Sequence, residues 1–247
     1  EDMNKVTHHL IDILELTDKN NAEFFANLAI ETMQKIKMRG RLPLAVGGTG
    51  LYFRAIFEGL FQVELDEEER KKFAESVENI PTEKLRGKLR EVDPETYMRL
   101  NKNDRYRIVR ALEVFELTGI PISEHFKRHA KSKKRRGLEF LKIGLTLKRE
   151  KLYERINKRT VEMFEKGWVD EVRELLNRGV DPSWPGMKTL GYPEIIDYLN
   201  GMIEYKELIK LVARLTRQYA KRQLTWFKKE NDVVWFQADE PGLIDKI

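Results

Sequence analysis

The residues with the clearest chemical potential form a glycine-rich loop, Gly-Gly-Thr-Gly at 47–50, between two apolar runs. A strand that enters such a loop and a helix that leaves it bring backbone N–H groups close to an anion. Thr49 adds a hydroxyl group at the same place. The loop lacks the GK[ST] ending of a nucleotide-binding P-loop. A phosphate or polar-substrate site is therefore one interpretation, and an ordinary β-to-α turn that uses the freedom of glycine is the other.

A second candidate is a long helix predicted over residues 204–229, which is basic on one face and leucine-rich on another. The basic face comprises Arg214, Arg217, Lys221 and Lys228. Hydrogen-bonding and stacking groups are added by Gln218, Arg222, Gln223 and Trp226. Cationic, amide and aromatic side chains together suit contacts with an RNA backbone and its bases. The residues leave open the alternative of a solvated helix face.

Two further pairs of arginines are spaced to share an anion. Arg155 and Arg159 lie one turn apart on a helix predicted over residues 149–166, and a bound pyrophosphate would offset their mutual repulsion. A surface pair between Arg159 and Glu162 is the alternative. Arg107 and Arg110 lie on one side of a helix predicted over residues 103–118, with Asn103 as its cap.

Metal chemistry has little support in the residues. His125 and His129 have the spacing of a zinc-binding helix, but no third ligand follows and their neighbours are basic. The chain of 247 residues contains no cysteine, which excludes disulfides, thiolate metal sites and a cysteine nucleophile, and fits a cytoplasmic protein. No apolar run approaches the roughly 20 residues that span a bilayer. The net charge of +5 suits an anionic partner without requiring one.

The order of predicted elements indicates an α/β protein with a parallel sheet and an inserted helical domain. Strands are predicted at 8–14, 42–46, 141–147 and 233–236, and helices at 21–39, 51–60, 168–178 and 192–199 in addition to those above. Residues 61–137 contain only helical patterns, at 66–79, 82–91, 93–100 and 103–118, and close on a basic cluster at 127–136. We therefore expect a core of residues 1–60 and 138–247, an inserted domain of residues 61–137, and a return linker at the basic cluster.

Several motifs together carry a resemblance to a known family. They are HHLID at 8–12, VGGTGLY at 46–52, DPETYMRLNKNDRYRIVRALEVFELTGIPIS at 93–123, KTLGY at 188–192 and KRQLTWFKK at 221–229. In this order they resemble the tRNA dimethylallyltransferases, also called tRNA isopentenyltransferases. The resemblance covers nearly the whole chain.

The resemblance implies a fold related to the P-loop kinases, with a helical insertion that grips the anticodon arm of tRNA. It implies transfer of a dimethylallyl group from dimethylallyl diphosphate to N6 of the adenine at position 37, which is flipped out of the anticodon loop. The expected partners are tRNA and the allylic diphosphate, without a membrane, and the expected state is a monomer. A P-loop-type small-molecule kinase is the alternative enzyme, although it needs neither the basic helix nor the insertion. A catalytically inactive RNA-binding module is the third interpretation.

The resemblance also assigns roles to residues. Thr49 matches the threonine that touches the target nucleotide, and Arg159 matches the arginine that binds the diphosphate, where Arg155 is its expected neighbour. Tyr106 is included among the tRNA contacts although the family commonly has glutamine there. The other expected tRNA contacts are Arg70, Arg107, Arg110, Lys188, Thr189, Gly191, Tyr192, Lys221, Arg222, Gln223, Thr225, Trp226 and Lys228.

The family places its phosphate loop and its catalytic aspartate before the His-His segment. The resemblance therefore predicts that residues 1–247 lack these parts, and that alone they bind tRNA better than they react. Mg²⁺ is expected with the diphosphate, but its protein ligand is expected in that preceding segment. No metal ligand is expected among residues 1–247.

Overall fold

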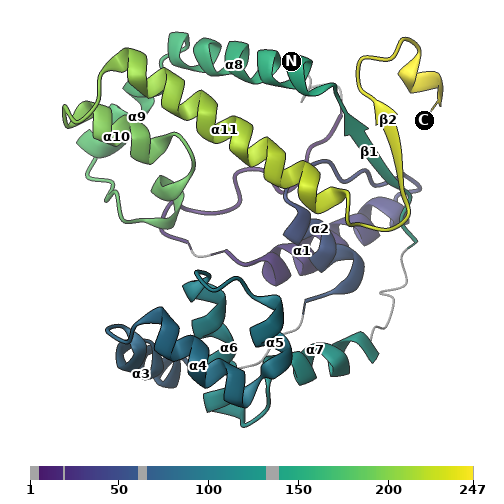
Figure 1. Cartoon of the computed structure of the whole chain (residues 1–247). Helices are drawn as coiled ribbons and strands as arrows, with labels where there is room; N and C mark the ends of the chain where they lie inside the picture. The colour runs from purple at the N-terminus through teal and green to yellow at the C-terminus, as the bar shows by residue number, and fades with distance from the viewer. Residues whose placement is uncertain (1–5, 19, 61–65, 132–138, 247) are drawn as a thin grey trace. The chain divides into compact units, whose positions relative to one another are not determined.

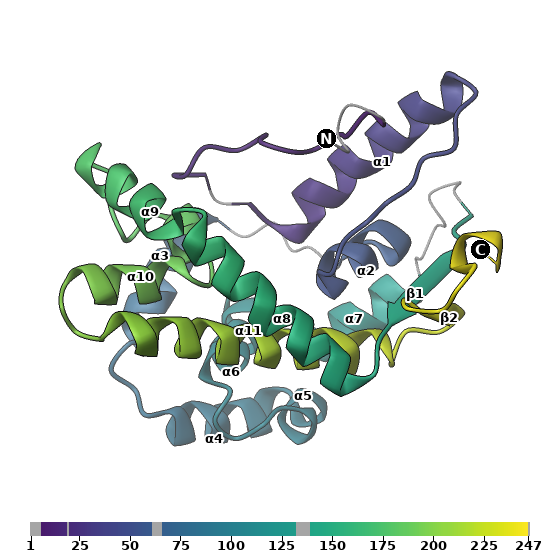
Figure 2. The ribbon, with the colours of Figure 1, turned by 90° about the horizontal axis from the view of Figure 1, so that it is seen from above.

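A computed structural model describes residues 6–18, 20–60, 66–131 and 139–246, without the side chains of residues 129–131. The chain divides into two compact units, which are described separately below. Unit 1 comprises Glu1–Ile56 and Leu138–Ile247, and unit 2 comprises Phe57–Gly137. Figures 1 and 2 show their elements from two directions.

Unit 1 combines helices with a small parallel sheet. Its strands β1 (Lys142–Thr146) and β2 (Val233–Gln237) pair in parallel, with Lys142 opposite Val233. Its helices are α1 (Ala22–Met38), α2 (Gly50–Glu58), α8 (Arg149–Glu165), α9 (Trp168–Asn177), α10 (Tyr192–Leu199) and α11 (Tyr205–Phe227). Two short 3₁₀ turns, η2 (Pro185–Lys188) and η3 (Leu243–Lys246), complete the unit. Helices α8 and α11 lie side by side (Figures 1 and 2).

The core of unit 1 lies where α8, α9, α10 and α11 meet. It is formed by Phe164, Val169, Val172, Met187, Ile195, Leu208 and Val212, all of them buried. On α9 and α11 the core residues follow helical spacing (Val169 and Val172, Leu208 and Val212), and burial of this apolar face of α11 positions it against α8 and α10. A rigid scaffold thus supports the outward-facing residues of these helices.

Helices are the only regular elements in the described residues of unit 2. Its elements are α3 (Glu67–Val77), α4 (Thr82–Val92), α5 (Pro94–Arg99), α6 (Arg105–Thr118) and α7 (Ile122–Lys131). The core consists of Val77, Leu85, Leu89, Ile108, Ala111, Leu112, Val114 and Ile122. The buried carboxylate of Asp93 ties the unit together, because one oxygen accepts from Thr96 N at the start of α5 and the other from Ser123 N in α7.

The predicted helices are confirmed to within a few residues, and so are the strands at 141–147 and 233–236. Local capping explains the accuracy of the starts: Asn21 precedes α1 and accepts hydrogen bonds from Glu23 N and Phe24 N. The predicted cap of α6 is wrong, because Asp104 and not Asn103 accepts from Arg107 N. Helix α7 occupies part of the predicted return linker at 127–136, whose remaining residues 132–136 lie outside the described residues.

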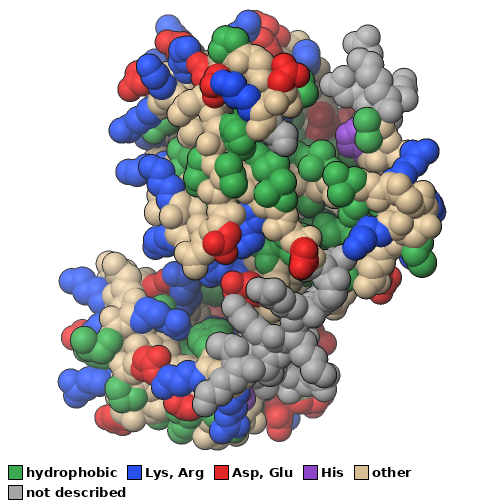
Figure 3. Space-filling view, turned by 90° about the vertical axis from the view of Figure 1, so that its right-hand side faces the viewer, with side chains coloured by type: hydrophobic (Ala, Val, Ile, Leu, Met, Phe, Trp, Pro, Cys, Tyr) green, Lys and Arg blue, Asp and Glu red, His purple; other side chains and the backbone are tan. Residues whose placement is uncertain are grey.

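Two predicted buried strands are wrong. Residues 8–14 are irregular and, apart from the half-buried Leu10, exposed, with left-handed backbone at Leu10 (φ 60°) and Asp12 (φ 54°). Residues 42–46 are also irregular, and Leu42, Leu44 and Val46 are 90%, 81% and 86% exposed. An apolar run becomes a strand only where neighbouring strands satisfy its backbone, and neither segment pairs with a described strand. Figure 3 looks onto the side where β1 and β2 lie in Figure 1, and it shows hydrophobic side chains gathered there.

None of the helices in the described part of the chain is both long and apolar enough to cross a membrane.

Candidate functional site

The glycine-rich loop packs against the C-terminal part of α11. The side-chain amide of Gln223 donates to the carbonyl oxygen of Gly48 at 2.9 Å. The loop and the KRQLTW motif, which the sequence separates by about 170 residues, thus form one structural unit. The backbone carbonyl of Thr49 accepts from Tyr52 N and Phe53 N and so begins α2.

Close packing explains two of the loop glycines. A Cβ atom on Gly48 would lie 2.1 Å from the Nε2 atom of Gln223, and one on Gly50 would lie 2.1 Å from Cδ1 of Trp226. Both positions have ordinary backbone angles, so they need glycine for space and not for a left-handed conformation. Glycine here permits close approach of α11 to the loop.

Contacts of Arg54 also hold α2, which follows the glycine loop, against the C-terminal end of α11. The guanidinium of Arg54 in α2 lies 4.7 Å from the centre of the Trp226 ring and forms an ion pair with Glu230 at 2.6 Å. Phe53 and Phe227 add an edge-to-face ring contact. These contacts hold the loop while the side chain of Thr49 stays exposed, with no hydrogen-bond partner for its hydroxyl among the described residues.

A cavity of about 620 Å³ lies beside the middle of α11, on the N-terminal side of its contact with the glycine loop. It is bounded by α8, α9, α11 and the segment that leads into α10. Its lining combines apolar side chains with two cations and one carboxylate. The lining residues are Ile156, Arg159, Thr160, Met163, Lys166, Trp168, Glu171, Thr189, Leu190, Tyr192, Val212 and Thr216. An apolar ligand with an anionic end matches such a lining.

Of the two arginines predicted to share an anion, only Arg159 lines this cavity. Arg159 is exposed and has no ion pair among the described residues; the predicted alternative partner Glu162 instead pairs with Lys158 at 3.8 Å. Arg155 lies close enough to Asp239 to help lower the pKa of that carboxyl, after the larger effect of the Lys151 hydrogen bond. The structure therefore separates the surroundings of the two arginines.

The predicted segment at 188–192 contributes three residues to the cavity wall, Thr189, Leu190 and Tyr192. The Tyr192 hydroxyl donates to the Glu171 carboxylate. Burial, together with this hydrogen bond, raises the pKa of Tyr192 to about 12. Gly191 is buried with φ +105°, and a Cβ atom there would lie 2.2 Å from the Trp168 ring. Lys188 is exposed outside this wall.

The basic face predicted on α11 is divided in the structure. Arg217 is half-buried and donates to Asn157 of α8 at 2.5 Å, whereas Arg214, Lys221 and Lys228 are exposed. Gln223 and Trp226, two of the predicted tRNA contacts, are used in the contact with the glycine loop. The exposed predicted contacts of this motif are Lys221, Arg222, Thr225 and Lys228.

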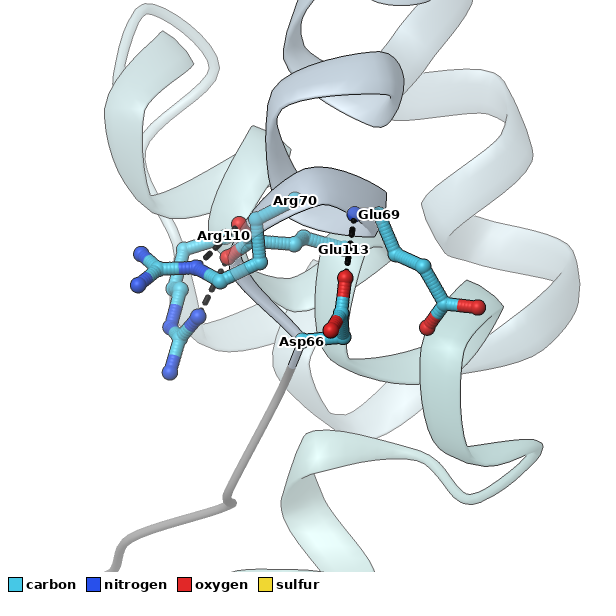
Figure 4. Close-up of polar contacts among 5 residues, drawn as sticks. All are labelled: Asp66, Glu69, Arg70, Arg110 and Glu113. Carbon is cyan, nitrogen blue, oxygen red and sulfur yellow. Dashed lines mark hydrogen bonds and ion pairs between the residues drawn. The ribbon is translucent and has the colours of Figure 1, made fainter.

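In unit 2, two of the predicted arginines converge on one carboxylate. Arg70 Nε donates to Glu113 at 3.1 Å, and Arg110 Nη1 donates to the other oxygen of Glu113 (Figure 4). Arg107 instead pairs with Asp104 at 3.0 Å, and Tyr106 is 82% exposed. All four predicted residues are therefore at least partly accessible to an anionic ligand.

The described residues contain no group of three or more His, Cys, Asp or Glu side chains that could hold a metal ion. The acidic lining of the cavity is the single carboxylate of Glu171, which already accepts from Tyr192. This donor set does not fit a protein-held divalent cation, so no chemical step is assigned to one below.

Sequence reasoning missed the residues that support the site. Arg54, Glu113, Trp168 and Glu171 each contact a predicted residue, and Glu230 forms an ion pair with Arg54. Their partners lie from 20 to 180 positions away, except within α6, so no local spacing marks them. The weak available signal was their type: a carboxylate inside an otherwise apolar stretch, such as Glu113 in RALEVF, commonly has a cationic partner.

Comparisons with known proteins identify the family of the chain. The IPP transferase family matches residues 1–230. The tRNA dimethylallyltransferase of Thermotoga maritima is 42% identical over 237 residues, which are 96% of this chain and 76% of that protein. The corresponding protein of Symbiobacterium thermophilum is 43% identical over 243 residues, covering 98% of this chain and 75% of its own length.

Solved structures give the same family. The full-length tRNA isopentenylpyrophosphate transferase of Bacillus halodurans matches with a TM-score of 0.64 and 36% identity, over 96% of this chain and 73% of that one. A eukaryotic dimethylallyltransferase acting on tRNA matches with a TM-score of 0.76 over 98% of this chain and 62% of its own, and at 23% identity it supports the fold alone. With a family match over almost its whole length and relatives above 40% identity, the chain belongs to the IPP transferase family, whose matched members are called tRNA dimethylallyltransferases.

Proposed function

We propose that the protein transfers a dimethylallyl group from dimethylallyl diphosphate to N6 of the adenine at position 37 of tRNA, next to the anticodon. In this reaction N6 forms a bond to the allylic C1, the C1–O bond breaks, pyrophosphate leaves and N6 loses a proton. Family membership supports the reaction class, and the parallel pair β1–β2 is compatible with a core of the P-loop-kinase type. We also propose that the enzyme works in the cytoplasm, on the tRNA found there.

The observation that carries the proposal is the placement of two sites on one face of α11. The cavity reaches α11 at Thr216, and the glycine loop reaches it at Gln223. Seven residues are nearly two full helical turns, so these side chains share a face about 10 Å apart along the axis. A nucleotide held at Thr49 and an allylic diphosphate held in the cavity would then approach each other along a single helix.

The cavity can bind both the apolar chain and the diphosphate of the donor substrate. Ile156, Met163, Leu190 and Val212 offer apolar surface for the five-carbon chain. The guanidinium of Arg159, which has no ion pair among the described residues, can bind the diphosphate and stabilise the charge that develops as it leaves. The exposed cations of α11 and the arginines of unit 2 can bind tRNA phosphates.

A transfer assay tests the reaction directly. The protein, expressed from its complete gene, is incubated with Mg²⁺, labelled dimethylallyl diphosphate and an anticodon stem-loop that carries adenine at position 37. Label is expected in this RNA and not in one with guanine at position 37, which lacks the N6 amine. Absence of label from both RNAs would refute the proposed reaction.

Arg159→Ala tests the location of the diphosphate, with Arg155→Ala as the matched control one turn away. Loss of a donor that acts on developing charge costs on the order of 10²–10³ in turnover. Arg159→Ala should therefore lower turnover by this factor with little change in tRNA affinity, whereas Arg155→Ala should change turnover much less. Equal losses from both variants would show that the diphosphate lies between the two arginines and not in the cavity.

A further inference from the structure

Glu113 is a carboxylate that is almost completely buried. It lies in α6 with its side chain only 11% exposed, among the apolar residues that form the core of unit 2. A buried carboxylate is costly unless charged partners compensate it. Both of its oxygens have such partners: Oε1 accepts from Arg70 and Oε2 accepts from Arg110.

The two arginines keep most of their donors available. A guanidinium carries five N–H groups, and the hydrogen bonds to Glu113 use Nε of Arg70 and Nη1 of Arg110. The side chains of Arg70 and Arg110 are 49% and 34% exposed. Figure 4 shows the two guanidinium groups next to each other, on the same side of the Glu113 carboxylate. The remaining donors therefore form a pair of forks with a fixed separation.

From this arrangement we propose that Glu113 is a positioning residue, which holds Arg70 and Arg110 as one preorganised clamp for a backbone phosphate of tRNA. The inference rests on the proposed function for the identity of the anion. Without Glu113, two like charges on long flexible side chains would separate, and binding would have to order them again. With Glu113, the pair presents two planar donor forks whose geometry matches phosphate oxygens.

The direction in which Glu113→Ala changes tRNA affinity distinguishes a positioning role from a purely electrostatic one. Removing Glu113 removes a negative charge next to a site for a polyanion. If Glu113 only lowered the local charge, Glu113→Ala would tighten tRNA binding and steepen its salt dependence. If Glu113 positions the clamp, the same substitution weakens binding, although the net charge becomes more positive.

The experiment measures tRNA affinity by filter binding at several salt concentrations for the wild type, Glu113→Ala, Glu113→Gln and the double variant Arg70→Ala/Arg110→Ala. We expect Glu113→Ala to weaken binding about tenfold, the scale of a charge-assisted hydrogen bond. We expect the slope of log K against log salt to fall by roughly 0.7–0.9, the value for one phosphate contact. Glu113→Gln keeps an acceptor oxygen and the shape of the side chain, so it should recover part of the affinity.

A matched control and a double-variant comparison complete the test. Glu68→Ala removes the same charge from α3, where Glu68 and Lys72 form an exposed pair at 3.9 Å, and it should not weaken binding. In the background of Arg70→Ala/Arg110→Ala, Glu113→Ala should have no further effect on affinity. Circular dichroism at the assay temperature confirms that each variant compared is folded.

The outcomes are distinct for the two proposals. If the wild type does not bind tRNA, the proposed function is refuted. If the wild type binds and Glu113→Ala binds equally or more tightly, the proposed function stands and the positioning role of Glu113 is refuted. The positioning role is also refuted if Glu113→Ala weakens binding equally with and without the two arginines, because its effect would then not pass through them.

Discussion

Replacing Gly50 with alanine tests the contact between the glycine loop and α11. Gly50 has ordinary backbone angles, so alanine introduces no backbone strain and adds a single methyl group. That methyl carbon would lie 2.1 Å from Cδ1, 2.3 Å from Nε1 and 2.6 Å from Cγ of the Trp226 ring. Ordinary contact begins near 3.4 Å, so the ring must move by 3.4 − 2.1 = 1.3 Å or more.

The Trp226 ring cannot move without loss of other contacts. Arg54 lies 4.7 Å from the ring centre and is fixed at its other end by Glu230, whose side chain is 10% exposed. Inserting a methyl group into packed structure costs about 1–3 kcal/mol. Loss of the cation–π contact adds about 0.5–1 kcal/mol. We therefore expect Gly50→Ala to lower the free energy of unfolding of unit 1 by about 1.5–4 kcal/mol.

Gly48→Ala is the matched comparison in the same loop. Its methyl carbon would meet the end of the Gln223 side chain, which can rotate away at the cost of its hydrogen bond to Gly48. The expected loss is about 1 kcal/mol, the typical net value of one hydrogen bond. Gly50→Ala should therefore lower the free energy of unfolding more than Gly48→Ala does, because its neighbour is a rigid ring and not a flexible amide.

Urea unfolding followed by tryptophan fluorescence measures these changes in unit 1, because all four tryptophans of the chain belong to it. Trp226→Phe is measured alone and in combination with Gly50→Ala, which gives a double-mutant cycle. The smaller ring should accommodate the methyl group, so the cost of alanine at position 50 should fall in this background. A cost of Gly50→Ala below about 0.5 kcal/mol, or full additivity with Trp226→Phe, would refute the packing argument.

Three other sets of substitutions test separate parts of the molecule. Gly87 lies inside α4 with open space around it, so Gly87→Ala should increase hydrogen-exchange protection of α4 by about 1 kcal/mol, whereas Gly119→Ala at φ +68° should decrease protection of α6. Burial alone would raise the pKa of Asp93, but hydrogen bonds from Thr96 and Ser123 outweigh it and hold the pKa below its ordinary value of 3.8. The ionised carboxylate thus contributes stability above pH 3.8 that is lost as the pH falls through the lowered pKa. Asp93→Asn should therefore lower the free energy of unfolding at pH 7, and its difference from the wild type should shrink in acid. A difference that does not change with pH would contradict this. Lys221→Ala and Lys228→Ala remove exposed cations from α11, and each should reduce the salt slope of tRNA binding by roughly 0.7–0.9; an unchanged slope would show that these lysines do not contact phosphates.

Helices were predictable from the sequence because their determinants are local. The periodic apolar residues of α1 and the cap at Asn21 lie within one short segment. The same applies to α11, whose buried residues Leu208 and Val212 are one turn apart. The error at the start of α6 concerned adjacent residues that can both cap a helix, Asn103 and Asp104.

Strands and side-chain contacts depend on distant partners and were therefore harder to predict. The apolar run at 42–46 has strand-like composition, but composition does not say whether another strand pairs with it. The candidate site residues were chosen by their type, and residue type does not say which of them lie together. Arg159 was predicted to act with Arg155, yet the cavity combines it with Trp168 and Thr189.

Helix α11 also limits which changes of length the protein can tolerate. The cavity and the glycine loop meet this helix at Thr216 and Gln223, nearly a whole number of turns apart. Deleting or inserting one residue between them would rotate one contact by about 100° relative to the other and shift it by about 1.5 Å. An insertion of seven residues would restore the common face but add about 10 Å between the two contacts. The count of residues in this stretch is thus a structural requirement in its own right, independent of which side chains fill it.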